Sequence, residues 1–100
     1  MTHMNTIAKR YADTIGVENT VSETIEILSN LIGSIAHQTP FGHYQSPRIY
    51  NDIAEACIHL EMMAYIATND DTLEAVKKFQ QNRLERLNIR INVIERSVEK

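Results

Sequence analysis

Polar side chains recur at helical spacing on two segments that are otherwise apolar. On 51-NDIAEACIHLEMM-63 they are Asp52, Glu55 and His59. On the segment that precedes it they are Glu26, Asn30, Ser34 and His37. Intervals of three and four residues place each set on one stripe of a helix, and antiparallel packing would bring the two stripes face to face. An oxygen-rich cluster suits Mg²⁺ that keeps waters for a phosphate ligand, and a histidine at its edge could bind phosphate, base or sugar.

Each polar residue of the later segment also has a purely structural explanation. Asp52 could complement the helix dipole near the start of its helix. Glu55 could pair with Arg86 or Arg90, and His59 could be a core histidine whose hydrogen bonds are satisfied. Burying carboxylates without a partner is costly, so the question is which groups lie opposite them.

Four helical segments and no strand are expected, so we predict an all-α fold in a single domain over residues 1–100. Three-and-four spacing predicts the first helix from about Thr2 to Ile15, with Gly16 as its stop. Thr20 and Glu23 resemble a capping box that would begin the second helix. Ser46 and Pro47 predict the start of the third helix, which would run to about Ala67, and 69-NDD-71 would cap a fourth helix in which Glu74 completes a box-like start.

Apolar residues predict which faces of these helices pack. The second helix has a stripe of Val21, Ile25, Leu28, Ile32 and Ile35. The third would face the core with Ile53, Cys57, Leu60 and Ala64. The fourth has a heptad-like seam of Leu84, Leu87, Ile91, Ile94 and Val98. Such a seam could pack along a helix of another subunit or within one bundle, and the sequence leaves both open.

Composition and charge narrow the partners. The net charge is −3, but residues 1–71 hold nine acidic and three basic residues, whereas residues 72–100 hold four acidic and seven basic. An acidic body does not suit duplex DNA, and 6% aromatic residues without tryptophan do not suit stacking on single strands. The single Cys57 is expected in a reducing compartment. No membrane-length apolar run and no signal peptide are evident, so we expect a cytoplasmic protein without membrane partners.

The segments 25-IEILSNLIGSI-35, 50-YNDIAEACIHLEMM-63 and 83-RLERLNIRI-91 resemble the MazG-like all-α nucleotide pyrophosphohydrolases, particularly the short phage and bacterial type. The resemblance covers about residues 20–91 and implies a four-helix, intertwined homo-oligomeric bundle, such as a homodimer or homotetramer. In that family a Glu-Glu-x-x-Glu pattern on the second helix and a Glu-Glu-x-x-Asp pattern on the third hold magnesium against a nucleoside polyphosphate.

The family's acids are carried over unevenly. On the third helix, Asp52 and Glu55 occupy acidic positions. On the second, one register aligns Glu26, Ile27 and Asn30 with the three acids, which leaves two carboxylates missing. Another register uses Glu23 and Glu26, but the expected capping box already accounts for Glu23, so the first register is preferred.

The resemblance therefore implies a nucleotide-binding protein with a degraded hydrolase site, which sequesters a phosphorylated nucleotide; by analogy, it could be a phage sponge for a host-defence signal. Alternatives are a Mg²⁺-dependent nucleoside triphosphate pyrophosphohydrolase, or a helical interaction module without a small ligand. No cofactor is required unless Mg²⁺ is bound, by Glu26, Asp52 and Glu55. The expected ligand-binding residues are Glu26, Asn30, His37, Asp52, Glu55, His59, Arg83, Arg86 and Arg90.

Overall fold

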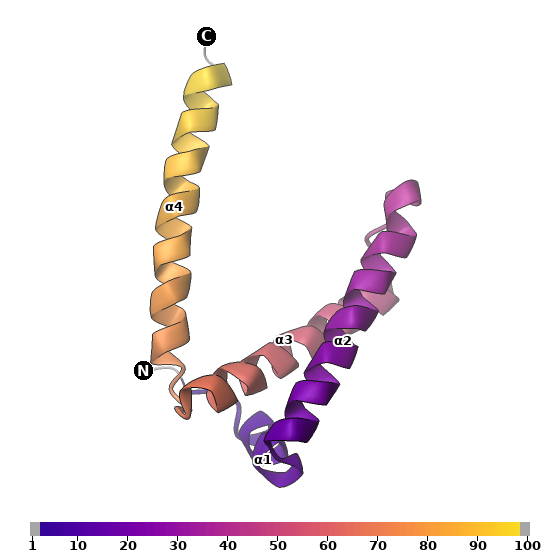
Figure 1. Cartoon of the computed structure of the whole chain (residues 1–100). Helices are drawn as coiled ribbons and strands as arrows, with labels where there is room; N and C mark the ends of the chain where they lie inside the picture. Colours follow the sequence, from indigo (N-terminus) through magenta and orange to yellow (C-terminus); the bar gives the residue numbers. More distant parts are fainter. Residues whose placement is uncertain (1–2, 99–100) are drawn as a thin grey trace.

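The computed structural model describes residues 3–98, which form four α-helices, one short 3-10 helix and no strand (Figure 1). The elements are α1 (Thr6–Ile15), α2 (Val17–Gln38), η1 (Thr39–Phe41), α3 (Pro47–Thr68) and α4 (Glu74–Val98). The predicted all-α class and the four helices are confirmed. Within residues 3–98, no helix combines the length and the apolar character that crossing a bilayer requires.

The first helix is shorter at its start than the sequence pattern predicts. It begins at Thr6 because Asn5 caps it: the Asn5 side-chain oxygen accepts hydrogen bonds from the amides of Ile7 (2.8 Å) and Ala8 (3.3 Å). Its predicted end at Ile15 is confirmed. Gly16 has a φ of +85°, a conformation that favours glycine, and the chain enters α2 directly after it.

The predicted capping box at the start of the second helix is wrong. α2 already begins at Val17, so Thr20 lies one turn inside it. Thr20 is fully buried, and its hydroxyl donates to the carbonyl of Gly16 at 2.8 Å. This bond back to the preceding turn satisfies a threonine inside a helix, so no capping role is needed. Glu23 is consequently free for other contacts.

The third helix begins as predicted, with the Ser46 hydroxyl accepting from the Ile49 amide at 3.2 Å and Pro47 in the first turn. It ends at Thr68, and Asn69 caps that end in the left-handed conformation, with a φ of 53°. The acidic turn therefore does not cap α4 as predicted. The α4 start instead has the Thr72 hydroxyl accepting from the Glu74 amide at 3.4 Å.

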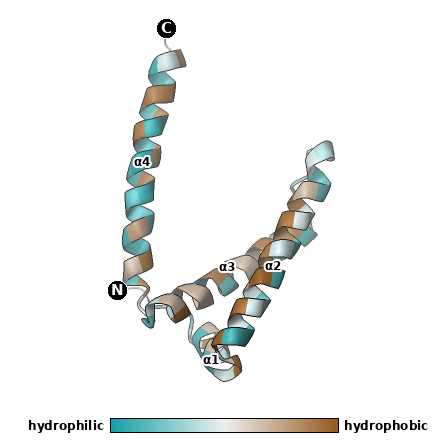
Figure 2. Cartoon of the chain, viewed as in Figure 1, coloured by the Kyte–Doolittle hydropathy of each residue, from teal (hydrophilic) through white to brown (hydrophobic). Residues whose placement is uncertain are grey.

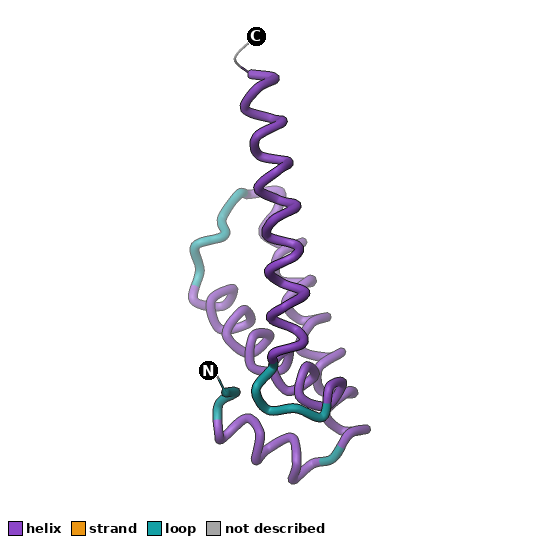
Figure 3. Tube along the Cα trace, turned by 90° about the vertical axis from the view of Figure 1, so that its left-hand side faces the viewer, coloured by secondary structure: helices purple, strands orange, loops and turns teal. Residues whose placement is uncertain are grey.

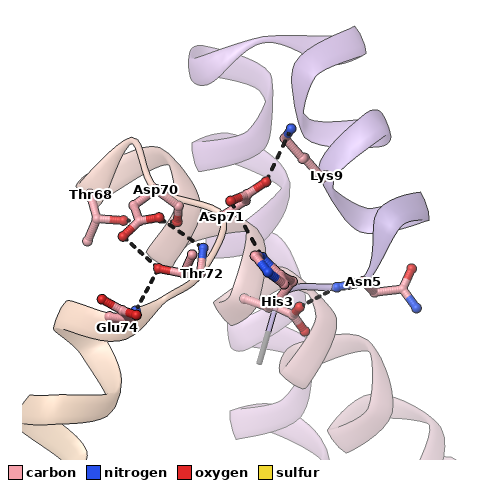
Figure 4. Close-up of polar contacts among 9 residues, drawn as sticks. His3, Asn5, Lys9, Thr68, Asp70, Asp71, Thr72 and Glu74 are labelled. Atoms are coloured by element: carbon pink, nitrogen blue, oxygen red, sulfur yellow. Dashed lines mark hydrogen bonds and ion pairs between the residues drawn. The ribbon is translucent and has the colours of Figure 1, made fainter. Parts of the chain in front are cut away.

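The turn between α3 and α4 is fixed to the N-terminal segment (Figure 4). The amide of Met4 donates to the carbonyl of Asp71 at 2.9 Å. The Asp71 carboxylate lies 3.4 Å from the Lys9 ammonium and 3.8 Å from a ring nitrogen of His3. These contacts hold the turn from which α4 departs.

The core of the body is small. α2 and α3 are antiparallel neighbours with the most extensive contact, and α1 packs on both. The buried residues are Met4, Ala8, Ala12, Thr20, Thr24, Ser34, Ile49, Ala56 and Met62. The predicted core face of α3 is therefore wrong: Ile53 and Leu60 are 44% and 51% exposed, and Cys57 is also exposed. The residues that α3 buries instead are Ile49, Ala56 and Met62.

α4 stands away from this body, with its N-terminal end at the turn and its length extending past the other helices (Figures 1 and 3). None of its described residues is buried. Its seam residues Leu84 to Val98 are all at least half exposed. Three isoleucines of the α2 stripe, Ile25, Ile32 and Ile35, are exposed as well. Figure 2 shows hydrophobic residues at intervals along both α2 and α4.

Candidate functional site

A polar pocket lies where the later half of α2 faces the first turns of α3. Its volume is about 390 Å³, and its lining residues are Ser29, Asn30, Gly33, Ser34, Arg48 and Asp52. The Ser34 hydroxyl donates a hydrogen bond to the Asp52 carboxylate, which ties the two helices together. The predicted juxtaposition of the two stripes therefore holds for Asn30, Ser34 and Asp52.

Arg48 provides the positive charge of this pocket. It lies in the first turn of α3, one turn before Asp52, and its side chain is exposed. The ion pairs within residues 3–98 do not include Arg48. A guanidinium with free donors can bind a phosphate through two parallel hydrogen bonds. The Asp52 carboxylate can accept hydrogen bonds from ribose hydroxyls or a base amine.

A second polar cluster connects α1, α2 and α3. The Tyr11 hydroxyl lies 2.9 Å from both carboxylate oxygens of Glu23. This hydrogen bond raises the pKa of the Tyr11 phenol above its ordinary value, because the carboxylate holds the phenolic proton. Across from it, the Nε2 atom of His59 lies 3.8 Å from a carboxylate oxygen of Glu23.

The His59 ring is largely enclosed, with 13% of its side chain exposed. Its Nδ1 atom lies 2.9 Å from the carbonyl oxygen of Glu55; a carbonyl only accepts, so Nδ1 donates. Its Nε2 atom is buried and has no hydrogen-bond partner among residues 3–98. A mostly apolar cavity of about 490 Å³ lies alongside, between α1 and α3, with Tyr11 and His59 in its wall.

Several predicted site residues do not join the polar pocket in a single chain. Glu26 and His37 are exposed on α2, where the His37 ring meets the edge of Phe41 at a centroid distance of 6.3 Å. The Glu55 carboxylate accepts from the Asn51 side chain at 3.4 Å, within its own helix. The three arginines expected at the site lie on the exposed α4: Arg83, Arg86 and Arg90.

The arrangement of carboxylates does not form a metal cage within one chain. Among residues 3–98, no three His, Cys, Asp or Glu side chains lie close enough together to hold a metal ion. Glu26, Asp52 and Glu55, the residues expected to hold Mg²⁺, therefore do not form such a group in this part of the chain.

Sequence reasoning missed two members of these sites. Arg48 lines the polar pocket and Tyr11 contacts Glu23, and neither is among the ligand-binding residues predicted from the sequence. The position of Arg48 was predictable: a residue in the first turn of α3 lies beside the last turns of an antiparallel α2. The role of Tyr11 was harder to predict, because Glu23 lies opposite α1 only when α2 begins at Val17 and not at Thr20.

Comparison of the chain with models of protein families, with curated proteins and with solved structures finds no match.

Proposed function

We propose that this protein binds a phosphorylated nucleotide in the α2–α3 pocket and does not turn it over. The observation that supports this proposal is the pocket that places Arg48 beside Asn30, Ser34 and Asp52. The arginine would bind a phosphate, and Asn30 and Asp52 would hydrogen-bond the sugar or base. A volume of about 390 Å³ falls within the usual range of small-molecule sites, roughly 300–1,000 Å³.

Binding without turnover agrees with the scarcity of carboxylates at this pocket. Among residues 3–98, Asp52 is the only acidic residue that lines the pocket, and Asn30 cannot act as a base or add negative charge. Phosphoanhydride cleavage by this kind of site would need a metal ion to activate water and stabilise the transition state. One carboxylate also repels the phosphates of a ligand less than four would.

The resemblance to MazG-like proteins makes the proposal more specific. We infer a MazG-like bundle completed by oligomerisation, because the apolar seam of α4 and the isoleucine stripe of α2 are exposed in the described part of one chain. The proposed role is sequestration of a nucleotide signal, as a phage sponge would do; this step is an analogy at the level of the fold.

The hydrolase alternative gains one argument from the structure. The register with Glu23 and Glu26 seemed unfavourable because Glu23 was assigned to a capping box, and that capping box does not exist. Glu23 now has Tyr11 as its hydrogen-bond donor and His59 nearby. The hydrolase reading therefore predicts Mg²⁺-dependent release of nucleoside monophosphate and pyrophosphate, requiring Glu23, Glu26, Asp52 and Glu55.

The test is calorimetric titration with nucleoside triphosphates and cyclic dinucleotides, with and without Mg²⁺. Arg48→Gln should weaken binding by about 10-fold or more, since a charge-assisted hydrogen bond is worth roughly 1.5–3 kcal/mol. Arg10→Gln, an exposed arginine on α1, is the matched control and should bind like the wild type. Equal affinity of the Arg48 variant and the wild type would reject the pocket.

A release experiment separates binding from hydrolysis. The complex is heat-denatured and the released ligand is chromatographed. Unaltered nucleotide supports sequestration, whereas converted product in excess over protein would establish the hydrolase. If no nucleotide binds, and Asp52→Ala and Glu55→Ala leave the biological activity intact, the interaction-module reading is favoured instead.

A further inference from the structure

α2 packs against the rest of its chain with a face of small polar residues and leaves large apolar side chains exposed. The residues it buries are Thr20, Thr24 and Ser34, whose side chains are small and polar. Three of its four isoleucines are exposed: Ile25 is 62% exposed, Ile32 67% and Ile35 40%. Leaving the large apolar side chains of a helix in water forfeits most of the hydrophobic stabilisation that its sequence could provide.

α4 carries a seam of matching periodicity. The α2 stripe advances by three and four residues from Ile25 through Leu28 and Ile32 to Ile35. The α4 seam does the same from Leu84 to Val98, and no described residue of α4 is buried. Alternating intervals of three and four are the pattern by which two helices interlock along their length.

The exposed area is too large for a chain of this mass. A folded monomer of 11.5 kDa is expected to expose about 5,800 Å². The chain exposes 7853 Å², an excess of about 2,000 Å². Two chains that covered this excess would bury about 4,000 Å², which is typical of obligate homodimers. The radius of gyration, 17.1 Å against about 13 Å expected for 100 residues, also describes an open chain.

Charge indicates which surfaces meet. α2 contains Glu18, Glu23 and Glu26 and no lysine or arginine, so its net charge is −3. α4 contains six basic and three acidic residues, so its net charge is +3. Pairing α4 with another α4 would bring two cationic helices together, whereas pairing it with α2 brings opposite charges together.

We propose that two copies of this chain form an exchanged homodimer, in which α4 of each copy packs along the exposed isoleucine stripe of α2 of the other. Each copy gives the same helix and receives the same helix, so the contact closes under two-fold symmetry. The inference makes the oligomeric part of the proposed function specific. It needs no nucleotide, so the dimer and the nucleotide pocket can fail independently.

Sedimentation equilibrium on the full chain tests the dimer. The wild type should have twice the 11.5 kDa mass of the chain. Ile91→Glu and Ile32→Glu each place a charge in the interface and should raise the dimer dissociation constant more than about 100-fold, because two symmetric sites are hit at once. Asn92→Glu adds the same charge on the adjoining, polar side of α4 and should remain dimeric.

Circular dichroism accompanies each measurement. Loss of helix in Ile91→Glu together with loss of the dimer, while Asn92→Glu keeps both, also supports the inference. Ile91→Ala adds no charge and should weaken the dimer more mildly, by about 10-fold or more. A monomeric wild type, including one whose α4 folds back on its own α2, overturns the proposal, and so does an Ile91→Glu variant whose dimer dissociation constant matches that of the wild type.

The salt dependence identifies the helix that α4 contacts. Opposite charges attract less when they are screened, so raising NaCl from about 0.05 M to about 0.5 M should increase the dissociation constant of the wild type and of Ile91→Ala. Two cationic α4 helices packed together would repel each other, and salt would then lower the dissociation constant. That opposite sign would reject contact with α2 in favour of an α4–α4 pair.

Discussion

Met62 is the residue whose truncation should cost the body of this protein most. It is 1% exposed and is the largest fully buried apolar side chain, packed against Met4, Ala8 and Ala12 of the N-terminal segment and α1. Methionine-to-alanine substitutions in cores cost about 2–5 kcal/mol, depending on how far the site collapses. The partly exposed neighbours Tyr65, Ile66 and Leu73 can close in, so we expect about 2–3 kcal/mol.

The assay is thermal and guanidinium unfolding at a fixed protein concentration, because dimerisation would make the transition depend on concentration. A cost of about 2–3 kcal/mol corresponds to a fall in Tm of roughly 10–20 °C for a domain of this size. Met62→Leu, which keeps the volume, should cost less than about 1.5 kcal/mol. If the stability of Met62→Ala lies within about 0.5 kcal/mol of the wild type, the core cluster of Met4, Ala8, Ala12 and Met62 is not what stabilises the body.

Three further substitutions test local contacts. Asn5→Ala should lower the free energy of unfolding by about 1 kcal/mol because it removes the cap of α1, and Asn5→Ser should keep most of that stability. Equal stability of the wild type, Asn5→Ala and Asn5→Ser would refute the capping role. The pKa of Tyr65 is raised because its hydroxyl donates to Asp13 at 2.7 Å, so this contact stabilises the fold below the unfolded-state pKa of about 10 and is lost as pH rises through the folded-state pKa. Tyr65→Phe should therefore lose less stability than the wild type between about pH 9 and pH 12; parallel pH profiles would contradict this. The pKa of Asp70 is lowered, first by the hydrogen bond from the Thr72 amide and then by that from the Thr72 hydroxyl, so its contribution is present above about pH 4 and is lost as pH falls through the folded-state pKa. The free energy of unfolding of Asp70→Ala should depend less on pH than that of the wild type below about pH 4. The same pH dependence in both would show that this hydrogen-bonded turn does not contribute to stability.

The sequence was sufficient to predict the helices but insufficient to predict how they pack against one another. Helical periodicity, the stop at Gly16 and the Ser46–Pro47 start are local signals, and the structure confirms them. The Thr20 capping box failed because Thr20 satisfies its hydroxyl equally well inside a helix. The prediction of the core face of α3 was wrong because the hydrophobicity of a side chain favours its burial but does not identify the surface that buries it.

The polar pocket shows the same division between local and spatial information. Asn30 and Asp52 were predictable as facing residues, because their spacing and an antiparallel hairpin suffice to bring them together. Arg83, Arg86 and Arg90 looked equally suitable in the sequence, yet they lie on a helix that leaves the body. Their positive charge predicts phosphate binding, but the direction that the chain takes after Thr68 determines which surface they can reach.

The two faces of α2 explain why a chain with so small a core should be stable. Its small polar face allows α3 to approach closely and leaves room for a polar pocket that includes Ser34 and Asp52. Large apolar residues on that face would fill the pocket, so the hydrophobic stabilisation of α2 has to come from its other face. In the part of the chain that the structure describes, Ile25, Ile32 and Ile35 on that face are exposed. The proposed binding pocket in the body and the proposed exchange of α4 would therefore both follow from one division of residues on α2, with the pocket on the small polar side and the second copy on the isoleucine side.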